Sequence, residues 1–131
     1  MAHWLMKSEP GTYSWADLVR DRQTEWDGVR NPTARLHLKA MKPGDEVFFY
    51  HSGDERQVVG IMRVTREARP DPKDAAWVSV AVEAVRAVKP VTLKQIKAEP
   101  SLAKMELVRL SRLSVSPVRD AEWAKVLEMA Q

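Results

Sequence analysis

Two short segments of the chain carry the residue types best suited to binding chemistry. Residues 6–10 read MKSEP and end an apolar run in a cation, a hydroxyl and a carboxylate, before a proline stops it. Residues 26–32 read WDGVRNP and combine an indole, a glycine, a guanidinium and an amide. Loops mix large aromatic, cationic and amide groups this closely mainly when they hold a flat, charged ligand. The two segments therefore indicate a site for a nucleobase and its phosphate.

Trp26 is interpreted as a residue that stacks on this base. It follows the polar run 21–25 and precedes Asp-Gly, so that no periodic apolar face includes it. A tryptophan on a loop rim can stack on a base, which is worth about 1–3 kcal/mol. The alternative is that Trp26 anchors its loop to the core. The other four tryptophans lie on expected strands or apolar helix stripes and are predicted to be core residues.

Cationic and polar groups beside these segments could hold the phosphate. Lys7 and Ser8 follow the first expected strand, where backbone amides, a hydroxyl and an ammonium can bind an anion. A solvated lysine and a turn-forming serine would explain them equally well locally. Asn31 is expected to cap a helix that begins at Pro32, and the positive end of that helix also suits an anion. Arg30 is the better candidate for direct contact with the ligand.

The remaining candidates come from two expected strands, and their types favour binding over catalysis. Phe48 and Tyr50 share one face of the strand 46–51, which ends in His51 and Ser52. The three histidines show no zinc pattern, cysteine is absent, and no nucleophile–base pair or glycine-rich phosphate loop occurs. We expect no metal, no cofactor and no enzymatic activity. The candidate base- and nucleic-acid-binding residues are Lys7, Ser8, Trp26, Val29, Arg30, Asn31, Arg35, Tyr50, His51, Ser52, Arg112 and Ser114.

Composition limits the class of protein. The 131 residues suit one domain, and 44% hydrophobic with 30% charged residues is ordinary globular composition. The net charge is +3, and residues 28–42 hold four cations and no acid, which is the electrostatic footprint of a polyanion partner or merely a solvated helix face. No apolar stretch is long enough to span a membrane, and the N-terminus lacks the pattern of a secretory signal. We expect a cytoplasmic protein, monomeric and without membrane contact.

Hydrophobic periodicity and turn residues predict a mixed fold. Expected strands cover residues 2–7, 46–51, 58–65, 77–88 and 113–118. Helices are expected to begin at Ser14, Asn31, Thr92 and Asp120, while residues 26–31 are expected to be irregular. The links between strands are too short for crossover helices. The prediction is therefore an α+β fold, in which a small, mostly antiparallel sheet curls into a barrel flanked by short helices.

A series of segments along the chain matches a known pattern: 4–10, 26–31 with Ala34 and Arg35, 41–45, 48–52, 59–61 and 111–118. In this order, these segments resemble the EVE domain, a branch of the PUA-like superfamily. The resemblance spans nearly the whole chain and implies a single EVE domain over residues 1–131 with a PUA-like β-barrel.

The resemblance also implies a function. EVE domains are thought to read modified bases, especially modified cytosines such as 5-methylcytosine in DNA. They are related to YTH domains, which hold methylated adenine of RNA in an aromatic cage. Lys7-Ser8 and Trp26 match a Lys-Ser pair and a cage tryptophan of that family, so that Trp26 would stack on an extruded base. The loop 69–76 lacks the partner aromatic of the YTH cage. The expected result is that Trp26→Ala abolishes the preference for modified DNA.

Two other functions remain open on the sequence alone. A PUA-like module could bind RNA, such as tRNA, rRNA or modified RNA, in which case removal of ribose 2′-hydroxyls would weaken binding. Related ASCH domains include enzymes that act on modified nucleosides. Lys7 and Glu9 would be the acid–base candidates for such a hydrolase.

Overall fold

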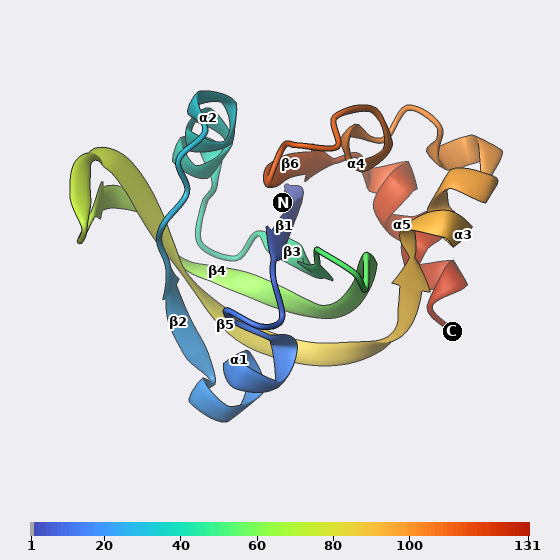
Figure 1. Cartoon of the computed structure of the whole chain (residues 1–131), viewed down its shortest axis with the longest axis horizontal. Helices are drawn as coiled ribbons and strands as arrows, with labels where there is room; N and C mark the ends of the chain where they lie inside the picture. Colours follow the sequence, from blue (N-terminus) through green and yellow to red (C-terminus); the bar gives the residue numbers. More distant parts are fainter. Residues whose placement is uncertain (1) are drawn as a thin grey trace.

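A six-stranded sheet with the strand order β2-β5-β4-β3-β1-β6 forms the frame of the molecule (Figure 1). The computed structural model describes residues 2–131. The strands are β1 (His3–Ser8), β2 (Gln23–Trp26), β3 (Glu46–His51), β4 (Gln57–Asp71), β5 (Asp74–Thr92) and β6 (Val115–Val118). The helices are α1 (Trp15–Asp21), α2 (Pro32–Ala40), α3 (Leu93–Ala98), the 3₁₀ helix η1 (Pro100–Leu102), α4 (Glu106–Arg109) and α5 (Asp120–Met129).

The sheet is mostly antiparallel and strongly curved, which confirms the predicted α+β class. Only the pair β1–β3 is parallel among the ladders of residues 2–131. The ladder between β4 and β5 contains several register shifts, and both strands bend through the length of the molecule in Figure 1. Bulges of this kind bend and twist a sheet locally. The strand order leaves β2 and β6 as the two edges of the sheet.

Both faces of the sheet are covered, so the aromatic strand β3 is buried on each side. Phe49 joins a core cluster with Met6 and residues of α1 and α2. Phe48 belongs to a second cluster, where its ring stacks on Trp123 of α5 with 3.8 Å between the ring centroids. Alternate residues of a strand point to opposite faces, and the apolar runs in β1 and β3 therefore serve two cores.

Local capping chemistry fixes the helix starts that the sequence predicts. Ser14 and Asp17 form a reciprocal capping box at α1, and Asn31 caps α2 ahead of Pro32. Thr92 caps α3 as expected. The final helix begins one residue earlier than predicted, with Arg119 rather than Asp120 as its N-cap.

Three parts of the sheet and of the C-terminal region differ from the prediction. The segment 23–26 was expected to be polar loop and irregular chain but forms the edge strand β2, whose first three residues are polar and give no apolar period. The proline-containing segment 70–72 does not end the pairing, because β4 runs to Asp71 and pairs there with Asp74. Helix α4 and the 3₁₀ helix η1 fill a segment with no predicted element, and β6 covers only Val115–Val118.

Gly60 of β4 allows helix α1 to pack on the sheet. A Cβ atom at this position would lie 2.5–2.6 Å from ring atoms of Trp15. We expect Gly60→Ala to lower the free energy of unfolding by about 1–3 kcal/mol, because the rigid indole and its helix must shift. Gly11→Ala is the matched control, since nothing lies within 4 Å of its Cβ position. Urea denaturation of both variants measures the difference, and equal stabilities would contradict the packing argument.

Candidate functional site

A cavity of about 510 Å³ opens between the edge strand β2 and the end of β1. Its volume falls within the usual range of small-molecule sites, about 300–1,000 Å³. Six of the predicted residues line it: Lys7, Ser8, Trp26, Val29, Arg30 and Ser114. The other lining residues were not among the predicted site residues; they are Thr12, Tyr13, Thr24, Glu25, Asp27 and Gly28. The two segments singled out by their chemistry thus form one site.

Trp26 is both a core residue and a wall of the cavity. It is the last residue of β2, pairs with Val80 of β5 and is only 8% exposed. Its ring meets Phe49 edge-on with 5.4 Å between the centroids. The expectation of an open loop-rim tryptophan is therefore wrong: the strand carries Trp26 into the core, and a small part of the side chain borders the cavity.

The loop after Trp26 is held in place by a buried carboxylate. Asp71 accepts hydrogen bonds from the backbone N–H of Gly28 at 2.9 Å, the Arg30 guanidinium at 3.0 Å and the backbone N–H of Lys73 at 2.7 Å. Gly28 has φ +79, a conformation that favours glycine. Burial alone would raise the pKa of Asp71, but these hydrogen bonds outweigh it and lower the pKa to about 2. The ionised Asp71 carboxylate therefore links the loop to the β4–β5 hairpin.

Lys7 and Ser8 tie the end of β1 to its neighbours. The Lys7 ammonium donates to the carbonyl of Ser111 at 2.9 Å, and burial lowers the pKa of this lysine. The Ser8 hydroxyl donates to the carbonyl of Tyr13 at 2.6 Å. Ser8 thus has the turn-forming role that was the local alternative, whereas Lys7 is half-buried rather than solvated. The Ser8 oxygen keeps lone pairs that can accept a hydrogen bond.

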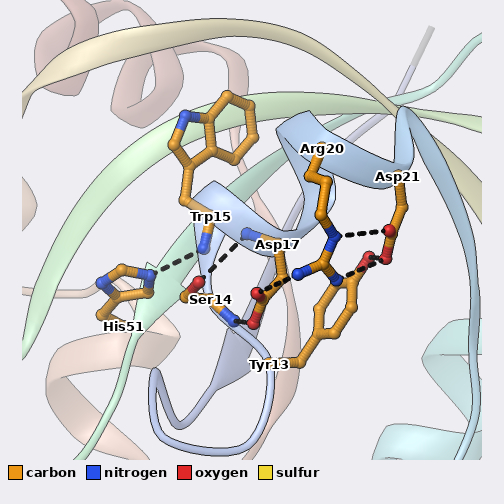
Figure 2. A network of polar contacts seen from close by, with 7 residues as sticks. All are labelled: Tyr13, Ser14, Trp15, Asp17, Arg20, Asp21 and His51. Atoms are coloured by element: carbon orange, nitrogen blue, oxygen red, sulfur yellow. Dashed lines mark hydrogen bonds and ion pairs between the residues drawn. The ribbon is translucent and has the colours of Figure 1, made fainter.

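Tyr13 adds a second aromatic side chain to the cavity. Its hydroxyl donates to Asp21 at 2.9 Å, and Asp21 is in turn held by Arg20, which also bonds Asp17 of the capping box (Figure 2). Burial raises the pKa of the Tyr13 phenol. This network fixes the ring against α1. The sequence signal that could have identified Tyr13 is its position directly before the helix cap Ser14, because the cap fixes the turn on which Tyr13 lies.

Glu25 is the acidic group beside Trp26 in the lining. Arg66 binds its carboxylate with two hydrogen bonds, at 2.8 and 2.6 Å, and the Ser79 hydroxyl donates to it as well. The Arg66 hydrogen bonds lower the pKa of Glu25 to about 2 against the opposing effect of burial. Its charge is therefore balanced by a bidentate partner on β4.

Exposed cations stand next to the acids of the lining. The Lys73 ammonium lies 3.5 Å from the Asp27 carboxylate, and the Arg69 guanidinium lies 3.9 Å from Glu25. Their side chains are 69% and 63% exposed. Each acid of the lining therefore has an exposed cation beside it.

Two predicted residues of the α2 region have structural partners elsewhere. The Asn31 side chain accepts from the backbone N–H of Ala34 at 2.9 Å, the expected cap. Arg35 donates to the carbonyl of Ala76 at 3.0 Å and lies over the Trp77 ring, 4.8 Å from its centroid. Neither residue lines the cavity.

The end of β3 does not line the cavity, contrary to expectation. Tyr50 is buried in the core cluster of Phe48, and burial raises its pKa to about 12. The His51 Nε2 atom accepts from the backbone N–H of Trp15 at 3.0 Å, as Figure 2 shows, and Nδ1 pairs with Glu55 at 2.8 Å. Ser52 lines a separate depression. Both nitrogens of the imidazole are thus engaged in holding α1 and the following turn.

Arg112 and the proposed acid–base pair also lie apart from the lining. Arg112 borders a separate hollow with Asn31 and Leu113. Glu9 lines a depression with Ser52, whereas Lys7 lines the main cavity. Among residues 2–131, no group of three or more His, Asp or Glu side chains is arranged to hold a metal ion. No helix within that range is long and apolar enough to cross a membrane.

Solved structures share this fold over essentially the whole chain. A protein from Rhodopseudomonas palustris is 47% identical, with a TM-score of 0.94 over 99% of this chain and 93% of the other. Human THYN1, solved in complex with DNA containing 5-methylcytosine, is 34% identical, with a TM-score of 0.93 over 100% of this chain and 98% of the other. An ASCH protein from Zymomonas mobilis, at 10% identity and a TM-score of 0.62, shares the fold.

Sequence comparison identifies the family. Human thymocyte nuclear protein 1 is 34% identical over 167 residues, which cover 99% of this chain and 74% of that protein. The family model of the EVE domain matches residues 2–129. The curved sheet and its flanking helices are thus shared with the solved relatives. The chain belongs to the EVE domain family.

Proposed function

We propose that the protein is a non-catalytic reader of a modified base, with modified cytosine in DNA as its ligand. The observation that carries the proposal is the complex of human THYN1 with DNA containing 5-methylcytosine, a protein with the same fold over the full length of this chain. The cavity between β1 and β2 supplies a site of suitable size in this chain. A base extruded from the duplex would enter this cavity, whose lining includes the aromatic residues Tyr13 and Trp26.

The electrostatics of the site support an anionic ligand. The cations Lys7 and Arg30 line the cavity, and the exposed cations Arg69 and Lys73 lie beside its acids Glu25 and Asp27. Phosphate contacts supply affinity that is independent of sequence and falls with salt. The base in the cavity then supplies the discrimination, and one added methyl group in an apolar pocket is worth about 1–3 kcal/mol. Flipping the base out of a duplex costs a few kcal/mol.

The same geometry favours binding over turnover. Lys7 is engaged with the carbonyl of Ser111, and Glu9 borders a different depression. The carboxylates of the lining are held by Arg66 and Ser79 in one case and lie beside Lys73 in the other. A general base needs to reach the proton that it removes. The residues around the cavity form walls and ion pairs instead of an activated nucleophile.

A cavity-blocking variant tests the proposal without disturbing the core. Wild-type protein is expected to bind a duplex with one 5-methylcytosine about 5–100-fold more tightly than the plain duplex, measured by fluorescence anisotropy. Thr12 is an exposed residue of the lining, and Thr12→Trp should remove this preference by filling the mouth. Val19→Trp, at an exposed site on α1 outside the cavity, is the matched control and should retain it.

The outcome that contradicts the proposal is equal affinity for the modified and the plain duplex in the wild-type protein. Tighter binding of the same sequence as RNA, lost when the 2′-hydroxyls are removed, would favour the RNA-binding alternative. Release of a new product from the modified duplex would favour an enzyme.

A further inference from the structure

We infer that the main chain of Glu25, on the open edge of β2, reads the hydrogen-bonding edge of the base. The reading selects a base that offers a ring nitrogen acceptor next to an exocyclic amino donor, the arrangement of cytosine, over thymine, which presents the opposite arrangement. This inference rests on the proposed function. It assigns the choice between amino and keto bases to the backbone, separately from recognition of the added methyl group.

The ladder between β2 and β5 sets the direction of the backbone groups. The Arg22 carbonyl accepts from the N–H of Ala84 at 2.9 Å, and β2 then pairs Thr24 with Val82 and Trp26 with Val80. Hydrogen-bonded residues alternate along an antiparallel strand. The N–H and C=O of Thr24 and Trp26 therefore point to β5, and those of Glu25 point away from it.

Glu25 presents these groups where the cavity lies. β2 is an edge of the sheet, with β5 as its only partner among the ladders of the described residues, and Glu25 lies between Thr24 and Trp26 in the lining. An edge strand offers a row of donors and acceptors to whatever approaches it. The Glu25 carbonyl accepts from the N–H of Asp27 at 3.1 Å and keeps a second lone pair. The Glu25 N–H is directed to the same side.

The side chain of Glu25 restrains strand β2. Arg66 and the Ser79 hydroxyl bind the carboxylate, so this segment is tied to both β4 and β5. The main-chain groups are thus fixed before a ligand arrives, and little ordering is needed when the base binds. A reading edge of this kind rejects the wrong base because that base would cover the Glu25 N–H and C=O without pairing with them.

The main-chain N–H and C=O of Glu25 are complementary to the hydrogen-bonding edge of cytosine. In an extended residue the N–H and C=O lie side by side and point the same way. The N–H can donate to N3 of cytosine while the C=O accepts from the N4 amino group. Thymine carries a donor at N3 and an acceptor at O4, so donor would face donor and acceptor would face acceptor. A bidentate pair of this kind corresponds to about 5–150-fold discrimination.

Thymine and 5-methylcytosine carry the same 5-methyl group, which makes them matched probes for the wild-type protein. Each is placed opposite an abasic site in the same duplex, so that base pairing contributes nothing to the comparison. We expect the 5-methylcytosine duplex to bind at least tenfold more tightly than the thymine duplex. Equal affinity for the two would overturn the inference, even where both bind more tightly than plain cytosine.

Two substitutions at one position isolate the N–H. Glu25→Ala removes the side chain and keeps the N–H, whereas Glu25→Pro removes both. Proline is tolerated on an edge strand where its nitrogen faces outward, and thermal unfolding of both variants verifies that they are folded. We expect the ratio of 5-methylcytosine to thymine affinities to be about tenfold lower in Glu25→Pro than in Glu25→Ala, because both variants lack the carboxylate and only the proline variant lacks the N–H. Equal ratios in the two variants would overturn the inference.

The 5-methylcytosine, cytosine and thymine duplexes together test this inference separately from the proposed reader function. If the wild-type protein binds 5-methylcytosine and cytosine duplexes equally, the proposed reader function fails and the inference fails with it. If 5-methylcytosine is preferred over cytosine but not over thymine, the reader function stands and the role of the Glu25 main chain falls.

Discussion

Asp71→Asn is expected to lower the free energy of unfolding by about 2–3 kcal/mol at neutral pH. The buried carboxylate accepts from Gly28, Arg30 and Lys73, and an amide oxygen with no charge pairs poorly with the guanidinium. The Arg30 side chain is 37% exposed, so water takes over part of its solvation and keeps the loss below that of a fully buried pair. Urea denaturation at pH 7 measures the difference.

The pH dependence of this difference gives a second measurement. The folded pKa of Asp71 is about 2, below its ordinary value of 3.8. A depressed carboxyl pKa stabilises the fold above the unfolded value, and the stabilisation is lost as pH falls through the folded value. The gap in unfolding free energy between wild type and Asp71→Asn should therefore be full above about pH 4 and shrink between pH 4 and 2.

Asp74 provides the matched control at the same hairpin. It is exposed, and its carboxylate accepts from the backbone N–H of Ala76 at 3.0 Å. Asp74→Asn is expected to change stability by less than about 0.5 kcal/mol, as surface substitutions usually do. Two results would contradict the stabilising role of the ionised Asp71 carboxylate. One is a loss of unfolding free energy in Asp74→Asn as large as that in Asp71→Asn, and the other is a difference between wild type and Asp71→Asn that does not vary with pH.

The sequence predicts best the features that are decided by near neighbours. The Ser14 capping box and the Asn31 cap ahead of Pro32 each involve groups three residues apart, and the chain carries their signatures openly. The contacts of Asp71 are not local in this way. Asp71 lies 43 residues from Gly28, and the segment PDP around it indicates only a turn. The sequence therefore predicts the segments 6–10 and 26–32 as parts of one site. It does not predict that the Asp71 carboxylate holds the second segment, because that contact is tertiary.

The aromatic strand illustrates a second limit. Its alternation correctly predicts that Phe48 and Tyr50 share one face and that Phe49 takes the other. Both faces of this sheet are covered by core, so alternation alone does not tell which face adjoins the cavity. The side that contains Phe49 also contains Trp26, whereas Tyr50 is buried with Phe48. The side that adjoins the cavity is decided by the edge strand β2, which has no apolar period of its own.

Trp26→Ala is expected to have its larger effect on stability and its smaller effect on recognition. Removing a buried tryptophan costs about 3–5 kcal/mol, and Trp26 is 8% exposed with its ring against Phe49. Stacking on a base is worth about 1–3 kcal/mol, and the small exposed part of this ring indicates the lower end of that range. We therefore expect the preference for the modified duplex to fall about fivefold instead of vanishing.

Trp26→Phe separates the two roles, because phenylalanine keeps an aromatic ring in the core and at the cavity wall. Thermal unfolding gives the folded fraction of each variant, and affinities for the modified and plain duplexes are measured at a temperature where both variants are folded. Trp26→Phe should retain most of the preference, while Trp26→Ala should lose it by the stated factor. A folded Trp26→Ala variant with the full wild-type preference would mean that the base is recognised without this ring. Recognition would then rest on Tyr13 and the main chain of β2.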